Sequence, residues 1–406
     1  MKIAILGFGT VGEGVYKILT ESKDLYQSRF GQSIEIEKIL VHNVAKKRDI
    51  KEANQIITDN FEEILQDPNI ELIVEVTSSK NQAIEYIRKS LMAGKHVVSA
   101  NKAAIAVDFK ELQKIAIQQN VHFKFEASVA GGIPVLSSLG RLIAFNDISL
   151  LHGIINSSTN YVLTEICKGR DETEVIAEAR ELGILEANPT DDIAGFDARR
   201  KLAILAMMIL QIEISEQSIP SFGITQVDSR DSEILNKLGY EIKLIAELLN
   251  GEKSGLKEKQ IALSVFPTAL NNSKFNRVNG MMNEVTFNGS YCGELRFYGA
   301  GGSMYPTANA IVSDIYETIT NKPLYFPVKE NQYENISDQI ESSFYIRIPD
   351  SLMVNEDLNN EIIEMAEKIL LAKKEVIIFS KPISNQKAVE LFERGLHVIR
   401  LNNKIK

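Results

Sequence analysis

Residues 1–19 read MKIAILGFGTVGEGVYKIL, which combines an apolar strand, a glycine-rich turn and a helix with Val15, Ile18 and Leu19 on one side. Residues 7–12, GFGTVG, match the pattern G-x-G-x-x-G directly after the strand. Glycines in this pattern permit a tight turn, close backbone approach to a pyrophosphate and close packing of the helix. The free N–H groups at the start of the helix also favour phosphate. The stretch predicts a dinucleotide-binding turn, with a purely structural turn as the alternative.

The strand–helix rhythm continues along the first third of the chain. Further strand patterns lie at 34–41, 70–76, 96–100 and 122–127, and helical patterns lie at 80–94 and 109–120. Near-continuous apolar strands that alternate with helices predict a parallel sheet buried on both faces. Such a sheet binds its ligand beyond the C-terminal ends of its strands, which here fall at residues 7–12, 77–79 and 99–102.

The predicted fold class is α/β, with a Rossmann-type parallel sheet first and two α+β parts after it. Residues 1–130, with a return segment at 298–325, are expected to form a nucleotide-binding domain. Residues 131–297, with long helices at 172–182 and 192–210, are expected to form a substrate-binding and dimerisation domain. After a polar linker, residues 340–406 read strand–helix–strand–helix–strand, with one of the helices over 359–370, and predict a small C-terminal domain.

Composition narrows the class of partner. The net charge of −9 does not suggest binding to nucleic acid or to anionic lipid. No apolar run reaches the roughly 18 residues of a membrane helix, and no signal region precedes the first strand. Cys167 and Cys292 form neither a metal-binding spacing nor a disulfide framework. We therefore expect a cytoplasmic protein that acts on a small molecule.

The end of the second strand bears on the choice between NAD and NADP. An acid there would bind the ribose 2′-hydroxyl of NAD, but the chain reads VHNV at 41–44. Lys46, Lys47 and Arg48 follow, and a basic cluster suits a 2′-phosphate. The pattern favours NADP, with a solvated surface loop as the alternative.

Residues 187–205, ANPTDDIAGFDARRKLAIL, place several charges at the entry to an apolar helix. Asp197 and Lys201 are four residues apart and share a helix face. On spacing alone this is an exposed ion pair, worth about 0.3–0.5 kcal/mol. Asp191 and Asp192 suit the start of a helix, where acids are stabilised by the helix dipole.

Six blocks carry a resemblance to a known family. They read GFGTVGEGV (7–15), HVVSANKAAIA (96–106), FEASVAGGIPVL (125–136), GIINSSTNYVLTEI (153–166), ELGILEANPTDDIAGFDARRKLAILA (181–206) and FYGAGGSMYPTANAIVSD (297–314). In this order, over about residues 1–320, they resemble the signature blocks of the homoserine dehydrogenase family. The resemblance implies reversible NAD(P)-dependent interconversion of L-homoserine and L-aspartate 4-semialdehyde, in the pathway from aspartate to threonine and methionine, by a homodimer.

The resemblance also implies roles for individual residues. Lys201 would transfer the proton, with a pKa lowered by burial and by Arg200, and Lys102 would assist it. Glu186, Asp197 and Asp192 would bind the substrate. A monovalent cation, Na⁺ or K⁺, would be held by main-chain carbonyls of Glu126, Val129, Gly131 and Ile133. The cofactor would contact Gly7, Phe8, Gly9, Thr10, Val11, Gly12, Thr77, Ser78, Ser99, Lys102, Gly183 and Gly302.

The chain departs from the family pattern at several places, among them Thr77, Ser78 and Ser79, where many members have two glycines. Ser157 stands in NSSTN where the family often has glycine, and Ser303 replaces a glycine in the late block. The C-terminal part resembles a degenerate ACT module without its usual proline–glycine turn, so threonine feedback is not expected. These departures raise the alternative of a catalytically weak nucleotide-binding sensor or interaction protein. The intact set of Lys102, Glu186, Asp197 and Lys201 favours the enzyme.

Overall fold

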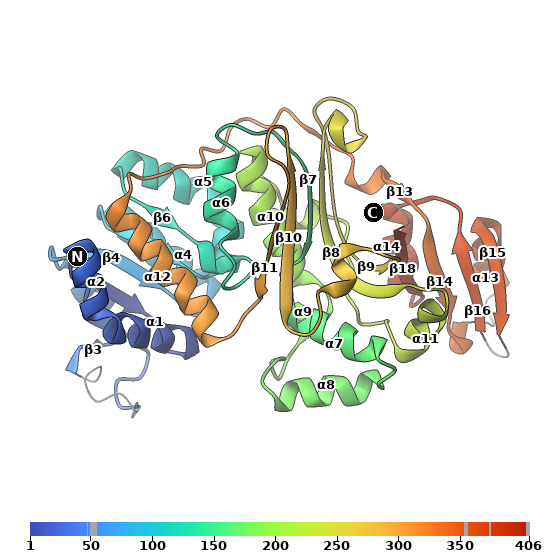
Figure 1. The fold of residues 1–406 in the computed structure, drawn as a ribbon, viewed down its shortest axis with the longest axis horizontal. Helices are drawn as coiled ribbons and strands as arrows, with labels where there is room; N and C mark the ends of the chain where they lie inside the picture. Colours follow the sequence, from blue (N-terminus) through green and yellow to red (C-terminus); the bar gives the residue numbers. More distant parts are fainter. Residues whose placement is uncertain (47, 49–54, 353–355, 373–374, 403–406) are drawn as a thin grey trace. The chain divides into compact units, whose positions relative to one another are not determined.

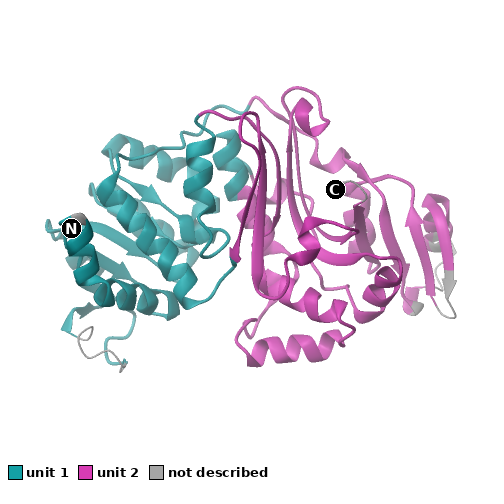
Figure 2. Cartoon of the chain, in the orientation of Figure 1, with its two compact units in different colours: residues 1–144, 204–214, 300–331 teal, residues 145–203, 215–299, 332–406 magenta. Residues whose placement is uncertain are grey.

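The computed structural model describes residues 1–46, 48, 55–352, 356–372 and 375–402 (Figure 1). The chain divides into two compact units (Figure 2). Unit 1 comprises residues 1–144, 204–214 and 300–331, and unit 2 comprises residues 145–203, 215–299 and 332–406. None of the helices in the described ranges combines the length and the apolar character that a membrane span requires.

Unit 1 contains a six-stranded parallel sheet in the order β3-β2-β1-β4-β5-β6. Its strands are β1 (Lys2–Leu6), β2 (Glu35–Leu40), β3 (Ile57–Thr58), β4 (Ile70–Glu75), β5 (His96–Ser99) and β6 (Phe123–Lys124). The central strands are buried along most of their length, because helices cover both faces. The predicted Rossmann-type sheet is confirmed.

Helices from distant parts of the chain cover this sheet. Those of unit 1 are α1 (Thr10–Glu21), α2 (Lys23–Phe30), α3 (Phe61–Gln66), α4 (Lys80–Met92), α5 (Lys102–Gln119), α6 (Val135–Leu142) and α12 (Met304–Thr320), with a 3-10 turn at Glu126–Ser128. Helices α1 and α12 lie side by side (Figure 1) and share one apolar core with the sheet, in which Val15 and Ile311 pack near Ile3 and Ile5. Helices α4 and α5 pack against each other. The sheet thus holds the residues after β1, β4 and β5 in a fixed frame.

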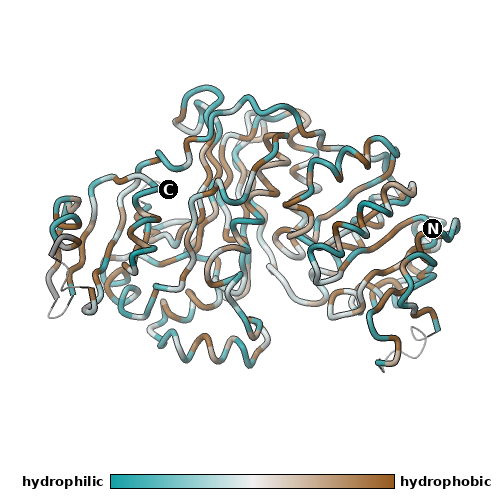
Figure 3. Tube along the Cα trace, turned by 180° about the vertical axis from the view of Figure 1, so that it is seen from behind, coloured by the Kyte–Doolittle hydropathy of each residue, from teal (hydrophilic) through white to brown (hydrophobic). Residues whose placement is uncertain are grey.

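Unit 2 is built on a ten-stranded mixed sheet, and a two-stranded sheet pairs β13 (Glu341–Ser342) with β17 (Ile383–Ser384). The strand order of the large sheet is β11-β10-β7-β8-β9-β18-β14-β16-β15, with β12 paired to β9. The bounds are β7 (Ile148–Ile154), β8 (Glu241–Asn250), β9 (Gln260–Leu270), β10 (Met282–Gly289), β11 (Gly293–Ala300), β12 (Glu334–Asn335), β14 (Phe344–Ile348), β15 (Ala366–Ala372), β16 (Glu375–Ser380) and β18 (His397–Asn402). The strands of both units are coloured mostly hydrophobic in Figure 3.

The helices of unit 2 are α7 (Ser157–Cys167), α8 (Glu172–Glu181), α9 (Thr190–Ile193), α10 (Phe196–Leu210), α11 (Ser229–Lys237), α13 (Glu356–Met365) and α14 (Asn385–Glu393). Short 3-10 turns occupy Glu216–Ser218, Glu252–Ser254, Lys274–Arg277, Ser337–Gln339 and Asp350–Leu352. Helix α10 starts in unit 2, and its residues from Ile204 onward belong to unit 1.

Three elements differ from the sequence prediction. The helix predicted over 192–210 is interrupted at Gly195, which adopts a φ of +82° between α9 and α10. The helix predicted over 359–370 ends at Met365, and Ala366–Ala372 forms β15, so an unpredicted strand lies between α13 and β16. Strand β8 was not predicted, although it pairs along its whole length with β9. In β8 and β15, pairing to neighbouring strands decides the conformation.

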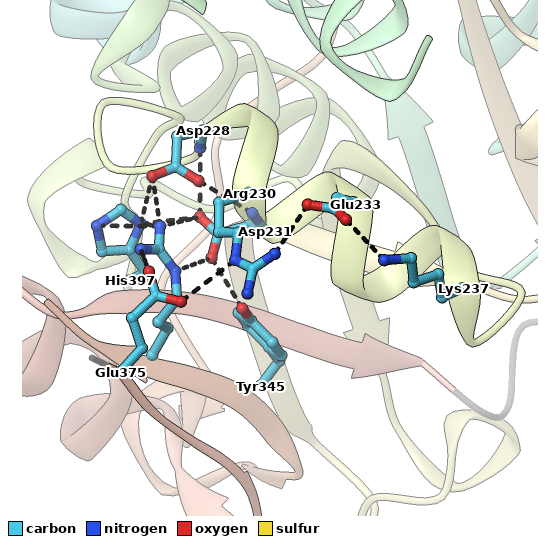
Figure 4. A network of polar contacts seen from close by, with 9 residues as sticks. Asp228, Arg230, Asp231, Glu233, Lys237, Tyr345, Glu375 and His397 are labelled. Carbon is cyan, nitrogen blue, oxygen red and sulfur yellow. Dashed lines mark hydrogen bonds and ion pairs between the residues drawn. The ribbon is translucent and has the colours of Figure 1, made fainter. Parts of the chain in front are cut away.

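A buried ionic network joins the C-terminal strands to α11 (Figure 4). The Arg347 Nε atom of β14 lies 2.6 Å from Asp231 Oδ1, and its Nη2 atom contacts Asp228. His397 Nδ1 of β18 lies 2.8 Å from Asp231 Oδ2. Asp228, Asp231 and His397 converge as metal ligands do, but the Arg347 guanidinium lies among them and supplies the balancing charge. Burial alone would raise the pKa of Asp231, but hydrogen bonds from His397 and Arg347 outweigh it and hold the pKa at about 2.

Acid should weaken unit 2 through this network. The depressed pKa of Asp231 contributes stability that is complete above about pH 4 and is lost as the pH falls to about 2. We expect Asp231→Asn to lower the free energy of unfolding at pH 7 by about 2–3 kcal/mol, and the gap to the wild type to narrow between pH 4 and 2. Urea unfolding at several pH values measures this. Glu258→Gln, in an exposed loop, controls for loss of one charge. A gap that does not change with pH would contradict the assignment.

Candidate active site

A cavity of about 570 Å³ lies at the C-terminal ends of the strands in unit 1. The turn after β1 contributes Gly7, Phe8 and Gly9 to its lining, and the segment after β4 contributes Thr77 and Ser78. Helix α1 begins at Thr10, immediately after this turn, so its free N–H groups lie next to the cavity lining. The cavity is large enough for part of a dinucleotide, and it contains predicted cofactor residues from two strand ends.

The turn requires glycine for two different structural reasons, one within the protein and one towards the ligand. A Cβ atom on Gly12 would lie 2.2 Å from the Gly7 carbonyl oxygen, so helix α1 could not pack against the turn. Gly7 itself has a φ of +102°, a conformation that favours glycine. A Cβ atom on Gly9 would meet no protein atom within 4 Å. The space beside Gly9 is therefore open, as close approach of a pyrophosphate requires.

Basic side chains line the same cavity beyond the end of β2. Lys46 and Arg48 are both part of the lining. Arg48 donates hydrogen bonds to the carbonyl oxygens of Lys46, at 2.9 Å, and of Asn43, at 3.3 Å, which fixes the loop. Lys47 falls outside the described residues. Asp59, after β3, is an acid on the cavity wall that the sequence analysis did not single out.

Behind the cavity lies Glu75, a buried acid at the end of β4 that the sequence analysis also missed. Its carboxylate accepts hydrogen bonds from Thr77 and from the hydroxyl of Ser99, which is fully buried. Burial raises the pKa of Glu75, and the hydrogen bonds from Thr77 and Ser99 act in the opposite direction. Helix α5 begins nearby at Lys102, capped by Asn101. The available signal was an acid inside the apolar run IELIVEV, where a parallel strand is normally apolar.

In unit 2, Lys201 and Asp197 form a buried ion pair. Lys201 Nζ lies 2.7 Å from Asp197 Oδ2 and donates to the Ile155 carbonyl oxygen at 2.9 Å. The exposed fractions of the two side chains are 12% for Lys201 and 2% for Asp197. The exposed ion pair that spacing alone suggested is therefore not what forms. The amine is held in position by two acceptors.

Asn156 organises the acids around this pair. Its Nδ2 atom donates to Asp192 Oδ1 at 2.6 Å and to Asp197 Oδ2 at 2.8 Å. Its Oδ1 atom accepts from the Thr159 amide at 2.8 Å and caps α7. The break at Gly195 lets Asp192 and Asp197 bond to the same amide group. Asn156 belongs to the sequence NSSTN, and no role was predicted for it.

Other charged residues of the helix entry are engaged elsewhere. Arg200 pairs with Asp191 at 3.2 Å and with Glu216 at 3.3 Å. The expectation that Arg200 acts on Lys201 therefore has no support in these contacts. Glu186 and Gly183 lie exposed in the segment between α8 and α9. Among the predicted substrate residues, the structure brings Asp192 and Asp197 together with Lys201, whereas Glu186 is a solvent-exposed side chain.

The predicted cation loop lies in unit 1. The Glu126 carboxylate accepts from the amides of Leu136, at 2.8 Å, and Ser137, at 2.7 Å, at the start of α6, and its own amide donates to Asp314 Oδ2 at 2.8 Å. Burial raises the pKa of both Glu126 and Asp314, and the charge of Glu126 raises that of Asp314 further. The loop then turns through Gly131, with a φ of +62°, and the carbonyls of Val129 and Ile133 flank this turn.

The two serine departures differ in their structural effect. Ser157 is the first residue of α7 and is not among the described residues with positive φ, so serine fits there without strain. Ser303 has a φ of +91° just before α12, in the region that favours glycine. Gly302, a predicted cofactor residue, precedes it, and its amide would lie 2.8 Å from a Cβ atom on Gly131. Backbone strain is therefore confined to the second departure.

Comparison with known proteins assigns the family. Residues 7–126 match the family model described as the NAD-binding domain of homoserine dehydrogenase, and residues 134–316 match the model described as homoserine dehydrogenase. The homoserine dehydrogenase of Pseudomonas aeruginosa is 34% identical over 98% of this chain and 87% of that protein. The chain belongs to the homoserine dehydrogenase family. Its activity is that of this NAD(P)-dependent oxidoreductase of the aspartate pathway, as expected from the six blocks.

Further relatives extend the comparison. The homoserine dehydrogenase of Bacillus subtilis is 36% identical over 80% of this chain and 74% of that protein. A crystal structure of a homoserine dehydrogenase from Thiobacillus denitrificans superposes with a TM-score of 0.83 at 28% identity, over 99% of this chain and 98% of that chain. The crystal structure of the S. aureus homoserine dehydrogenase at pH 6.5 superposes with a TM-score of 0.76 at 28% identity, over 100% of this chain and 99% of that chain. These structures extend through the C-terminal strands, which the two family models do not cover.

The two kinds of glycine can be separated by substitution. Gly9→Ala adds a methyl group into open space, so the fold should be kept while the dissociation constant for NADPH rises about tenfold or more. Gly12→Ala forces a methyl group against the Gly7 carbonyl, so the free energy of unfolding should fall by about 1–3 kcal/mol. Calorimetric titration and thermal unfolding of both variants measure this. If Gly9→Ala binds NADPH as the wild type does, the turn does not hold the pyrophosphate.

Proposed function

We propose that Lys201 Nζ accepts the hydroxyl proton when homoserine is oxidised and returns it in the reverse reaction, and that Lys102 assists this transfer. The observation that carries this role is the buried amine of Lys201, held by Asp197 and the Ile155 carbonyl. When bound, NAD(P) takes up or supplies the hydride. Lys102 is supported by its position at the start of α5, directly after the end of β5.

The substrate is a zwitterion, and acids on unit 2 are proposed to bind its ammonium group. Asp192 and Glu186 are the proposed contacts. Asp197 is proposed to contribute by holding Lys201 and Asn156, to which its carboxylate is bonded. Asp192 is supported by its hydrogen bond to Asn156, which directs its carboxylate. The role of Glu186 is supported by its position in the block at 181–206 and by the solvent exposure of its side chain. This division leaves proton transfer and ammonium binding to different side chains.

The cofactor is proposed to be NADP rather than NAD. Lys46 and Arg48 on the cavity wall support this choice, because guanidinium and ammonium groups bind phosphate. Along with the turn at 7–12, Thr77 and Ser78, the proposed contacts include Ser99, Lys102, Gly183 and Gly302. A solved structure of a hyperthermophilic archaeal homoserine dehydrogenase mutant, 26% identical to this chain, is a complex with NADPH.

Three further features are proposed. The carbonyls of Glu126, Val129, Gly131 and Ile133 would hold Na⁺ or K⁺, supported by the left-handed turn at Gly131. Unit 2 would form a homodimer, supported by the exposed side chain of Tyr298 on the edge strand β11. A cytoplasmic location is supported by two cysteines that are both free thiols.

Lys201→Ala should lower kcat by about a hundredfold to ten-thousandfold, because the proton loses its acceptor, while the dissociation constant for NADPH stays near that of the wild type. Steady-state assays with homoserine and calorimetric titration with NADPH measure the two effects. Arg200→Ala is the matched control, since it removes a positive charge one residue away that pairs with Asp191 and Glu216. The control should keep most of the activity. Equal losses in the two variants would argue against a specific role for Lys201.

Lys46→Ala should raise KM for NADP about tenfold and leave KM for NAD unchanged, because only NADP carries the 2′-phosphate. Lys46 suits this test better than Arg48, whose bonds to Asn43 and Lys46 also hold the loop. Lys114→Ala, on the exposed side of α5, controls for the loss of a cation. If Lys46→Ala changes neither KM, or if Asp59→Asn raises KM for NAD alone, the preference for NADP is wrong.

A further inference from the structure

Glu75 is the last residue of β4, and its side chain has no exposed surface. Three donors surround its carboxylate. The Thr77 amide and hydroxyl donate to Oε1 at 2.8 and 2.5 Å, and the Ser99 hydroxyl donates to Oε2 at 2.7 Å. Thr77 follows β4, and Ser99 ends β5. The carboxylate therefore connects the C-terminal ends of two neighbouring strands at the edge of the sheet where ligands bind.

Asn101 closes these contacts into a ring. Its amide donates to Ser99 Oγ at 3.0 Å, and its Nδ2 atom donates to the Thr77 carbonyl at 3.0 Å. Its Oδ1 atom accepts from the Ala104 amide at 3.1 Å and so caps α5. The ring runs from Glu75 through Ser99, Asn101 and Thr77 back to Glu75. The first residue of α5, Lys102, is attached directly to it.

Every group that bonds to the Glu75 carboxylate can act as a hydrogen-bond donor. The amides of Thr77 and Asn101 can only donate. Ser99 Oγ accepts a hydrogen bond from the Asn101 amide. The hydroxyl proton of Ser99 can therefore be donated to Glu75 Oε2, whose lone pair accepts it. A glutamine at position 75 has the same shape as glutamate, but an NH2 group, which only donates hydrogen bonds, replaces one of its two carboxylate oxygens. The ring would then contain buried donors without acceptors, which is costly.

We infer that Glu75 is a positioning residue for Lys102, because its carboxylate closes the hydrogen-bonded ring that fixes the start of α5 against the ends of β4 and β5. The inference rests on the proposed role of Lys102. Nothing in it requires Glu75 to touch substrate or cofactor. Its effect on the reaction passes through Ser99 and Asn101 to the backbone of Lys102, in the same unit that holds the cofactor cavity.

The test uses the full-length enzyme with Glu75→Gln and Ser99→Ala. Hydrogen exchange by mass spectrometry follows the peptide that covers residues 100–106, which includes the Asn101 amide of the ring and the Ala104 amide that Asn101 caps. Both variants should exchange there about fivefold faster than the wild type. The kcat of both variants should fall about tenfold to a hundredfold. In Glu75→Gln, KM for NADP and homoserine should stay nearly unchanged, because misplacing a reacting group affects turnover more than binding. Ser99→Ala keeps the test decisive if Glu75→Gln folds poorly.

Ser90→Ala is the matched control. Ser90 is a fully buried serine of α4 in the same unit, and its hydroxyl has no hydrogen-bond partner among the described residues. In the Ser90→Ala variant, hydrogen exchange at residues 100–106 and kcat should equal those of the wild type. Unchanged exchange in both ring variants, or faster exchange with unchanged kcat, would overturn the inference. Lys102→Ala is measured in parallel: if it keeps full turnover, the proposed role of Lys102 fails, whereas the exchange result still reports on the ring itself.

Discussion

A carboxylate that is buried in a protein loses its hydration, and only hydrogen-bond donors or cations placed around it offset the cost. This constraint recurs at every functional part of the chain. Glu75 receives three donors at the end of β4, and Glu126 receives two amides at the start of α6. Asp197 and Asp231 are instead balanced by Lys201 and by Arg347. Each solution holds a loop or a helix end in one geometry.

The two solutions have different chemical consequences. An acid that is satisfied by a main-chain amide and neutral hydroxyls, such as Glu75, fixes the backbone without a cation beside it. The pair of Asp197 with Lys201 instead places an amine, which can exchange protons, at a defined position. The Arg347 network uses a cation that cannot be deprotonated, so it joins elements without chemistry. The type of balancing group thus separates the positioning sites from the site that is proposed to react.

Much of unit 1 could be predicted from the sequence because its signals are local. An apolar strand, a glycine turn and a helix follow one another within about twenty residues, and the strands are apolar along their length. Strand β8, with the residues EIKLIAELLN, has no such signal, since its conformation is decided by pairing with β7 and β9. The same holds for β15, where the residues favour a helix until β16 pairs with them.

The candidate site divides in the same way. The spacing of Asp197 and Lys201 shows a shared helix face, but their burial depends on residues far along the chain, such as Ile155. Glu75 and Asn156 were missed because each depends on a partner more than twenty residues away, Ser99 for Glu75 and Asp197 for Asn156, and no local pattern connects them. Residues that are proposed to react are therefore easier to find from the sequence than the residues that hold them in place.

Two asparagines show why those holding residues are hard to replace. Asn101 and Asn156 each follow a strand and cap the next helix through Oδ1, and each uses Nδ2 for a second bond. Aspartate, serine or threonine could serve as the cap, but none of them offers the amide donor as well. An aspartate at 156 would still cap α7, yet it would set a third carboxylate against Asp192 and Asp197. The need for asparagine at this position therefore comes from the active site rather than from the helix.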